Sequence, residues 1–204
     1  MAYTIAQVRT AVLALLDDVS AVRYTSAQID QAARTALIDY DIFKPVVRTY
    51  AFETDGNKMM ELPTSFATTA ILRIEEYNAD PDLVVDLRYR AKMIDEQWVI
   101  NIEDTQYAAG VTLTIYYLGP NTVDGLDSAA GTTVLDSSLF CQGCAGYAAQ
   151  SRAVSRAESI NLQASVMSQL LQLSQKYLTA YMAGLRNRPA EANYYPMTMP
   201  EVRF

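Results

Sequence analysis

The sequence predicts an α+β protein: a helical bundle of about four helices, interrupted by an inserted, mostly antiparallel β-domain and followed by an extended C-terminal tail. Two helix-start motifs occur near the N-terminus, the apolar spacing changes from helical to alternating after Pro45, and helical spacing returns after residue 136. In this chain of 204 residues, we therefore expect the bundle at 1–45 and 121–189, the β-domain at 46–120 and the tail at 190–204.

The first two helices are expected at 4–17 and 26–43. Thr4 precedes Gln7 by three residues, and Thr25 precedes Gln28 by the same distance. This is the spacing of a capping box, in which each side chain accepts a hydrogen bond from the other residue's backbone N–H. Apolar residues at helical spacing follow each motif, so each helix has one face to bury. Pro45 disfavours helical geometry at the residue before it, which predicts the end of the second helix.

Alternation with a period of two begins at Val46 and indicates a strand. Further strands are expected at 59–62, 70–77, 83–89, 97–102 and 111–118. Turn-forming residues separate them, for example Asp55-Gly56-Asn57 and Ala109-Gly110. Short loops with no helix between the strands favour antiparallel pairing, so 46–120 is interpreted as one β-unit.

Helical spacing after the connector 121–136 predicts two more helices, at 137–157 and 161–186. The stretch 161–185 of the second would be about 37 Å long at ~1.5 Å per residue, which is long for a small globular domain. Residues 190–204 contain two prolines and no apolar period. Because such a segment cannot bury its own rings, we expect it to be extended and docked on another subunit. Its expected anchors are Tyr194, Tyr195, Met197, Met199 and Phe204.

The composition excludes several classes of function. The chain has no histidine, so Ser-His-Asp and Cys-His catalysis and the usual imidazole-containing metal sites are excluded. Two cysteines cannot form a disulfide framework. A net charge of -7 argues against a protein whose main task is to bind nucleic acid. No apolar run approaches the roughly 20 residues of a membrane span, and no signal sequence is evident, so we expect a cytoplasmic protein without a membrane partner.

Two groups of residues could still carry chemistry. Cys141 and Cys144 have the spacing of a redox motif, but their predicted helical context favours small structural residues over disulfide exchange or a metal site between subunits. The densest acidic cluster could hold a divalent cation, although it matches no calcium loop and is interpreted as a solvated turn. Its members are Glu75, Glu76, Asp80, Asp82 and Asp86. The sequence thus predicts no catalytic, cofactor-binding or metal-binding residue.

Charge and tyrosine content favour interaction with other proteins. Residues 46–120 hold six basic and twelve acidic side chains, whereas 137–189 hold five basic and one acidic. These opposite signs could complement each other within one chain or between copies, or they could simply be solvated. The chain has fourteen tyrosines, a residue enriched where protein surfaces meet. Tyr116-Tyr117 is interpreted as strand packing, and Tyr194-Tyr195 as a contact with a partner.

Together these features resemble the head-to-tail adaptor, or connector, proteins of tailed bacteriophages. The resemblance covers nearly the whole chain, in the order Tyr-Thr-x-Ala-Gln helix starts, β-insertion, two long helices and tail. Within the insertion, Leu62-Pro63-Thr64-Ser65-Phe66 is similar to the family's Leu-Pro-x-x-Phe step. Trp98 and the strand end from Tyr116 to Pro120 are similar to its later pattern.

The resemblance implies a non-enzymatic virion protein in the neck, assembled in the host cytoplasm. It implies a ring of about twelve copies that binds the portal above and tail or nozzle proteins below, with DNA passing through the lumen without specific binding. Two other classes stay open. One is a monomeric protein-binding module with a β-domain, and the other is a thiol- or metal-dependent enzyme.

Overall fold

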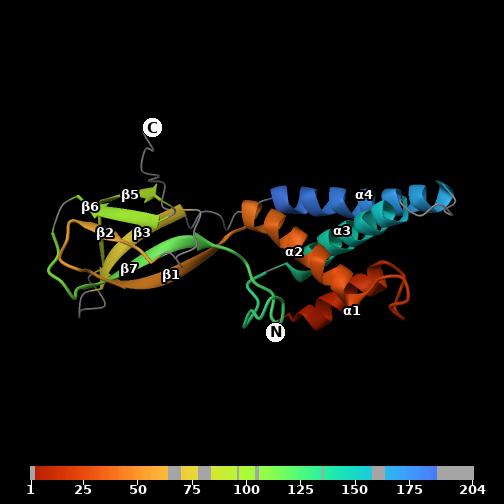
Figure 1. Ribbon diagram of the computed structural model, residues 1–204, viewed down its shortest axis with the longest axis horizontal. Coiled ribbons are helices and arrows are strands. Elements are labelled where there is room, and N and C mark those ends of the chain that lie inside the picture. The colour runs from red at the N-terminus through yellow and green to blue at the C-terminus, as the bar shows by residue number, and fades with distance from the viewer. Residues whose placement is uncertain are drawn as a thin grey trace. The chain divides into compact units, whose positions relative to one another are not determined.

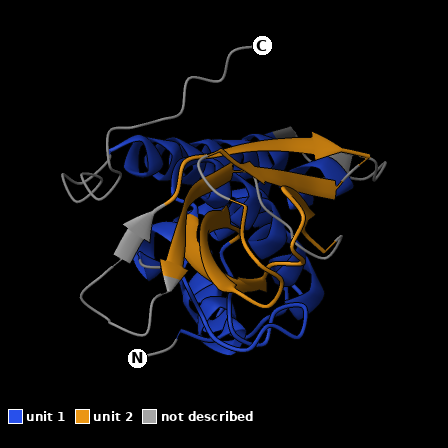
Figure 2. Ribbon diagram, turned by 90° about the vertical axis from the view of Figure 1, so that its left-hand side faces the viewer, with its two compact units in different colours: residues 1–45, 121–197 blue, residues 46–120, 198–204 orange. Residues whose placement is uncertain are grey.

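A computed structural model describes residues 3–63, 70–77, 84–95, 97–103, 106–134, 136–157 and 164–187. The chain forms two compact units, one built from residues up to Pro45 and from Asn121 onward, the other from Val46–Pro120. We call them the helical unit and the β-unit (Figures 1 and 2). The described residues form four helices and two antiparallel sheets, which confirms the predicted α+β class.

The helical unit contains α1 (Ile5–Leu15), α2 (Ser26–Phe43), α3 (Ser137–Ala157) and α4 (Ala164–Arg186). Both predicted capping boxes are present. The Gln7 backbone N–H donates to Thr4 Oγ1 at 3.4 Å, and the Thr4 N–H donates to the Gln7 side chain at 2.8 Å. The corresponding distances for Thr25 and Gln28 are 3.3 and 2.9 Å. The predictions for α2 and α3 match their observed bounds, and residues 161–163 of the fourth predicted helix lie outside the described residues.

Helix α1 ends earlier than its predicted end at residue 17. Asp17 has a φ of 52°, in the left-handed region, and stops the helix after the C-cap Leu16. The Asp17 N–H donates to Ala14 O and the Asp18 N–H to Leu13 O, at 3.2 and 2.9 Å. This pair of bonds is a Schellman motif, which usually has glycine at the left-handed position. An aspartate there gave no sequence signal for the stop.

The core of the helical unit is built on close packing of α4 against α3. Two glycines of α3, Gly143 and Gly146, face α4. A Cβ at Gly143 would lie 2.8 Å from the Tyr181 ring, and one at Gly146 would lie 2.7 Å from Leu178. These glycines therefore let the two helices approach more closely than alanine would allow.

The β-unit contains one sheet in the order β1-β7-β3-β4 and another in the order β2-β6-β5, and neighbouring strands in each sheet are antiparallel. The strands are β1 (Val46–Glu53), β2 (Met59–Glu61), β3 (Ala70–Tyr77), β4 (Val84–Asp86), β5 (Tyr89–Ile94), β6 (Gln97–Ile102) and β7 (Thr112–Gly119). Buried apolar side chains from both sheets form the core of the β-unit. They include Met60, Leu62, Ile74, Ile100, Ile102, Leu113 and Ile115.

One strand prediction was wrong. The predicted strand 83–89 is divided between β4 and β5, which belong to different sheets. The chain changes sheets at two adjacent residues, because the Leu87 N–H bonds to Ile74 O on β3, whereas the Arg88 carbonyl accepts from Glu103 N–H just beyond β6. Alternation of apolar and polar residues shows which face of a sheet each side chain takes, but it does not show which strand is the neighbour. The change of sheet at residues 87 and 88 therefore could not be predicted from the alternation.

Candidate functional site

The two cysteines lie in the core of the helical unit. Cys141 Sγ is 3.0 Å from the Tyr3 hydroxyl, and both thiols are buried. Burial raises the pKa of Cys141 above its ordinary value, although the hydrogen bond between Cys141 and Tyr3 acts to lower it. Burial raises the pKa of Cys144 further. Disulfide exchange needs an accessible thiolate, and this environment favours buried, protonated thiols.

The described part of the acidic cluster is engaged with neighbouring side chains. Glu75 forms an ion pair with Arg73 at 3.1 Å, and Glu76 accepts a hydrogen bond from the Tyr107 hydroxyl at 3.0 Å. Asp80 and Asp82 lie outside the described residues, as does the side chain of Asp86. Among the side chains that the structure describes, no three or more His, Cys, Asp or Glu residues gather as a metal site would require.

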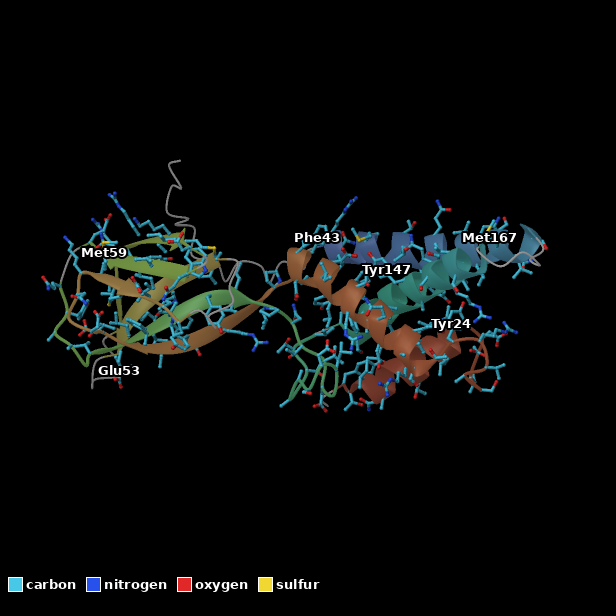
Figure 3. The ribbon with its side chains drawn as sticks, viewed as in Figure 1. Tyr24, Phe43, Glu53, Met59, Tyr147 and Met167 are labelled. Atoms are coloured by element: carbon cyan, nitrogen blue, oxygen red, sulfur yellow. The ribbon has the colours of Figure 1, made fainter. Side chains whose placement is uncertain are left out.

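Several tyrosines act as hydrogen-bonding links between helices. The Tyr181 hydroxyl, from α4, donates to Ala36 O on α2 at 2.6 Å. Tyr177 donates to Leu15 O at the end of α1 at 2.8 Å. Tyr147 of α3, labelled in Figure 3, donates to the Asp39 carboxylate. Burial, with a contribution from Asp39, raises the pKa of Tyr147 to about 12. These tyrosines therefore have a structural role, which their number in the sequence did not reveal.

The expected partner-binding residues, Tyr194, Tyr195, Met197, Met199 and Phe204, lie outside the described residues. The helical unit offers a different candidate, the α1–α2 loop, which we define as residues 16–25. Its Val19 and Val22 are 79% and 82% exposed. Single exposed apolar residues are ordinary on a protein surface, whereas two on one short loop of defined structure indicate a candidate contact with a partner.

A buried carboxylate organises the α1–α2 loop. Asp18 accepts hydrogen bonds from the backbone N–H groups of Val22, Arg23 and Tyr24, at 3.2, 2.8 and 2.8 Å. Burial acts to raise the pKa of Asp18, but these three bonds outweigh it and lower the pKa below its ordinary value. The carboxylate is thus ionised at neutral pH and satisfies three donors of the loop.

Backbone geometry fixes the same loop. The Ala21 N–H donates to Asp18 O at 2.8 Å, closing a turn, and Ala21 has a φ of 52°. A left-handed alanine is strained by ~1–2 kcal/mol. At the far end, the buried Tyr24, labelled in Figure 3, directly precedes the second capping box. The guanidinium of Arg152, on α3, lies over the Tyr24 ring, 4.9 Å from the ring centroid. The loop is therefore a formed structure with two valines directed to the solvent.

A second exposed apolar site lies near the C-terminal end of α2. Ile38 and Ile42, one turn apart, are 63% and 68% exposed. We call this pair the α2 isoleucine patch. Asp39 and Asp41 lie between them in the sequence. Asp39 uses one carboxylate oxygen to accept from Tyr147, and Asp41 uses one to accept from the backbone and side chain of Asn121.

Helix α4 exposes apolar residues in its N-terminal half. Val166 and Leu171 are exposed, whereas Tyr181 and Leu185, nearer the C-terminal end, are fully buried. The charged residues of 164–187 are Lys176 and Arg186, so this stretch carries no acid. The helical unit therefore displays apolar side chains on α4, on the α1–α2 loop and on the α2 isoleucine patch.

Sequence reasoning missed the α1–α2 loop and the α2 isoleucine patch. Ile38 and Ile42 lie on the opposite side of α2 from its buried residues, such as Ile29 and Tyr40, so their place outside the apolar stripe was a signal that could have found the patch. A comparison with known protein families finds no matching model, and a comparison with curated proteins finds no match. No described helix is long and apolar enough to cross a membrane.

Proposed function

We propose that this chain is a structural virion protein, a head-to-tail adaptor that forms a ring between the portal and the tail of a bacteriophage and lines the DNA passage. The observation that carries the proposal is the presence of separate exposed apolar sites on one helical unit, the α1–α2 loop and the α2 isoleucine patch. A closed ring is held by heterologous contacts, in which each copy uses two different surfaces. The order of the sequence elements, which resembles that of the adaptor family, supports the same assignment.

The charge of the chain suits a passage for DNA. A net charge of -7 repels the phosphate backbone, so DNA could slide through a ring of such subunits without binding to it. The excess of acid in 46–120 and of base in 137–189 could add attraction between neighbouring copies. In this proposal the ring has about twelve copies, as the family resemblance implies, and it assembles in the host cytoplasm before taking its place in the virion neck.

The C-terminal tail supplies the proposed attachment to the portal or to the adjacent adaptor. Its anchors are Tyr194, Tyr195, Met197, Met199 and Phe204, aromatic and methionine side chains of the kind enriched in protein interfaces. Tail or nozzle proteins would bind the opposite side of the ring. No cofactor, metal or catalytic residue takes part in this function.

The test is the mass of the assembled protein. Native mass spectrometry should give a high multiple of 22.6 kDa for the protein alone or with purified portal. Sedimentation velocity of the same samples checks that the assembly exists in solution. A mass of one copy under both conditions would contradict the adaptor proposal and favour the monomeric binding module.

A further inference from the structure

We infer that the α1–α2 loop and the α2 isoleucine patch are the two halves of one head-to-tail contact, in which the loop of one copy docks on the patch of the next copy. The inference rests on the proposed ring and adds to it the surfaces that join neighbouring subunits. Its partner is a second copy of this chain.

The α1–α2 loop already has a defined structure in the single subunit. The Asp18 carboxylate holds three backbone N–H groups, and the left-handed Asp17 and Ala21 fix the turns on either side of Val19. Docking a formed loop loses less conformational entropy than ordering a flexible one. Strained backbone persists where the surrounding structure over-determines it, and it is often found at functional sites. The loop directs its valines outward under these constraints.

The α1–α2 loop cannot contact the α2 isoleucine patch of the same copy. It ends where α2 begins, and Ile38 lies twelve residues after Ser26 on the same helix, about 18 Å along its axis at ~1.5 Å per residue. Because α2 is rigid between them, the two sites contact each other only across two copies. Such a contact uses two different surfaces, so it leaves a free loop at one end of a dimer and a free patch at the other. It adds further copies in the same way, and it forms a ring when the rotation between neighbouring copies closes.

The exposed Arg23 favours the patch over α4 as the receiving surface. Arg23 is exposed and directly follows Val22, whereas the exposed acid of the loop, Asp17, precedes the buried Asp18. Within the described residues, Asp39 Oδ1 and Asp41 Oδ2 have no hydrogen-bond partner, which leaves one oxygen of each carboxylate available beside the isoleucines. The described residues of α4 include no acid that could pair with the same guanidinium. In the proposed contact, the two valines of the loop pack on the two isoleucines of the patch. Arg23 then lies toward Asp39 and Asp41, so apolar side chains meet apolar ones and a positive charge meets negative ones.

The test uses variants at exposed positions, which leave the core intact. Val19→Asp with Val22→Asp damages the loop, and Ile38→Asp with Ile42→Asp damages the patch. Each double variant should need at least a hundredfold higher protein concentration to assemble, measured by sedimentation velocity, while its circular dichroism stays that of the wild type. Ser20→Asp is the matched control, because it adds charge to an exposed position of the same loop without removing an apolar side chain. It should assemble at close to the wild-type concentration.

Mixing the two double variants gives the sharpest result. The loop-damaged copy keeps its patch, and the patch-damaged copy keeps its loop. One intact contact remains possible between them, so an equal mixture should form a complex of two copies, one of each variant, and no larger species. Native mass spectrometry distinguishes the variants by mass and would show this pair directly.

The outcomes separate the inference from the proposed function. If the wild type forms no ring, alone or with portal, both fail. If the wild type forms rings and both double variants do so at the same concentration, the adaptor proposal stands and this contact is wrong. If Leu171→Asp abolishes the ring while Ile38→Asp with Ile42→Asp does not, α4 is the receiving surface and the proposed pairing is overturned.

Discussion

Replacing Gly143 with alanine tests how closely α3 and α4 pack. The added Cβ would lie 2.8 Å from two atoms of the Tyr181 ring, well inside van der Waals contact. The ring cannot move aside freely, because Tyr181 is fully buried and its hydroxyl donates to Ala36 O at 2.6 Å. Relief of the clash would therefore move α4 away from α3 or break this link to α2.

Two effects of opposite sign determine the result. Alanine is favoured over glycine in a helix interior by about 1 kcal/mol, which would stabilise the helical unit. Overpacking a close-packed core destabilises by about 1–3 kcal/mol, and loss of the Tyr181 hydrogen bond by about 1 kcal/mol more. The structure therefore predicts a net loss of about 1–3 kcal/mol in the free energy of unfolding.

The two units provide separate signals for the measurement. Circular dichroism at a helical wavelength follows the helical unit during urea unfolding. Trp98, the single tryptophan of the chain, lies on β6, so its fluorescence follows the unfolding of the β-unit. Gly143→Ala should lower the urea midpoint of the helical signal and leave that of Trp98 nearly unchanged. Ser155→Ala, at an exposed position of α3, is the control and should change stability by only a few tenths of a kcal/mol.

A gain in stability for Gly143→Ala would refute the reasoning. Such a gain of about 1 kcal/mol is what helix propensity alone predicts, and it would mean that Tyr181 has room to move. The close approach of α3 and α4 would then not depend on glycine.

Four further predictions follow from the sequence and the structure. Cys141→Ala with Cys144→Ala should leave particle assembly intact, measured as the yield of filled heads with tails, because both thiols are buried. Replacing 46–120 with a short Gly/Ser linker should keep strong helical circular dichroism, because the helical unit has its own core. Asp18→Asn should remove part of the loss of stability at acid pH, measured by urea unfolding across pH. A lowered pKa gives stability that is present above the ordinary aspartate pKa and lost as the pH falls through the lowered value. Deleting 190–204 should leave thermal stability nearly unchanged and abolish attachment to portal-filled heads.

Each has an outcome that would contradict it. Lost assembly with normal folding would give the cysteines a role beyond packing, and a wholly unfolded linker variant would mean that the helical unit is not an independent core. An unchanged acid profile for Asp18→Asn would remove the carboxylate as the main support of the loop. Truncated protein that joins heads at wild-type yield would show that the tail is not a docking segment.

The local rules in the sequence predicted the helices well. A threonine and a glutamine three residues apart defined the starts of α1 and α2, and Pro45 defined the end of α2, because caps and proline act on the backbone within one turn. The stop of α1 was missed, since it depends on an aspartate in a conformation that glycine usually takes. The strand order β1-β7-β3-β4 was beyond reach, because pairing of residues far apart leaves no local pattern.

The candidate site was less predictable than the fold. Asp18 organises the α1–α2 loop through three backbone N–H groups, and nothing in Asp17-Asp18-Val19 distinguishes it from a solvated turn. Exposure of Val19 is likewise decided by how the helices pack, since the sequence shows an apolar residue but not whether it is buried. Ile38 differs, because it lies opposite the apolar stripe of α2 and the helical spacing already places it outside the buried face. The predicted anchors in 190–204 stay a prediction.

Cryo-electron microscopy of the protein mixed with purified portal protein tests the adaptor proposal most directly. The proposal predicts class averages with a closed ring of identical subunits beneath the portal, around a continuous central passage, with the α1–α2 loop of each subunit against α2 of the next. Isolated single copies on the portal, or a portal with no added density at concentrations well above those used for assembly, would contradict it.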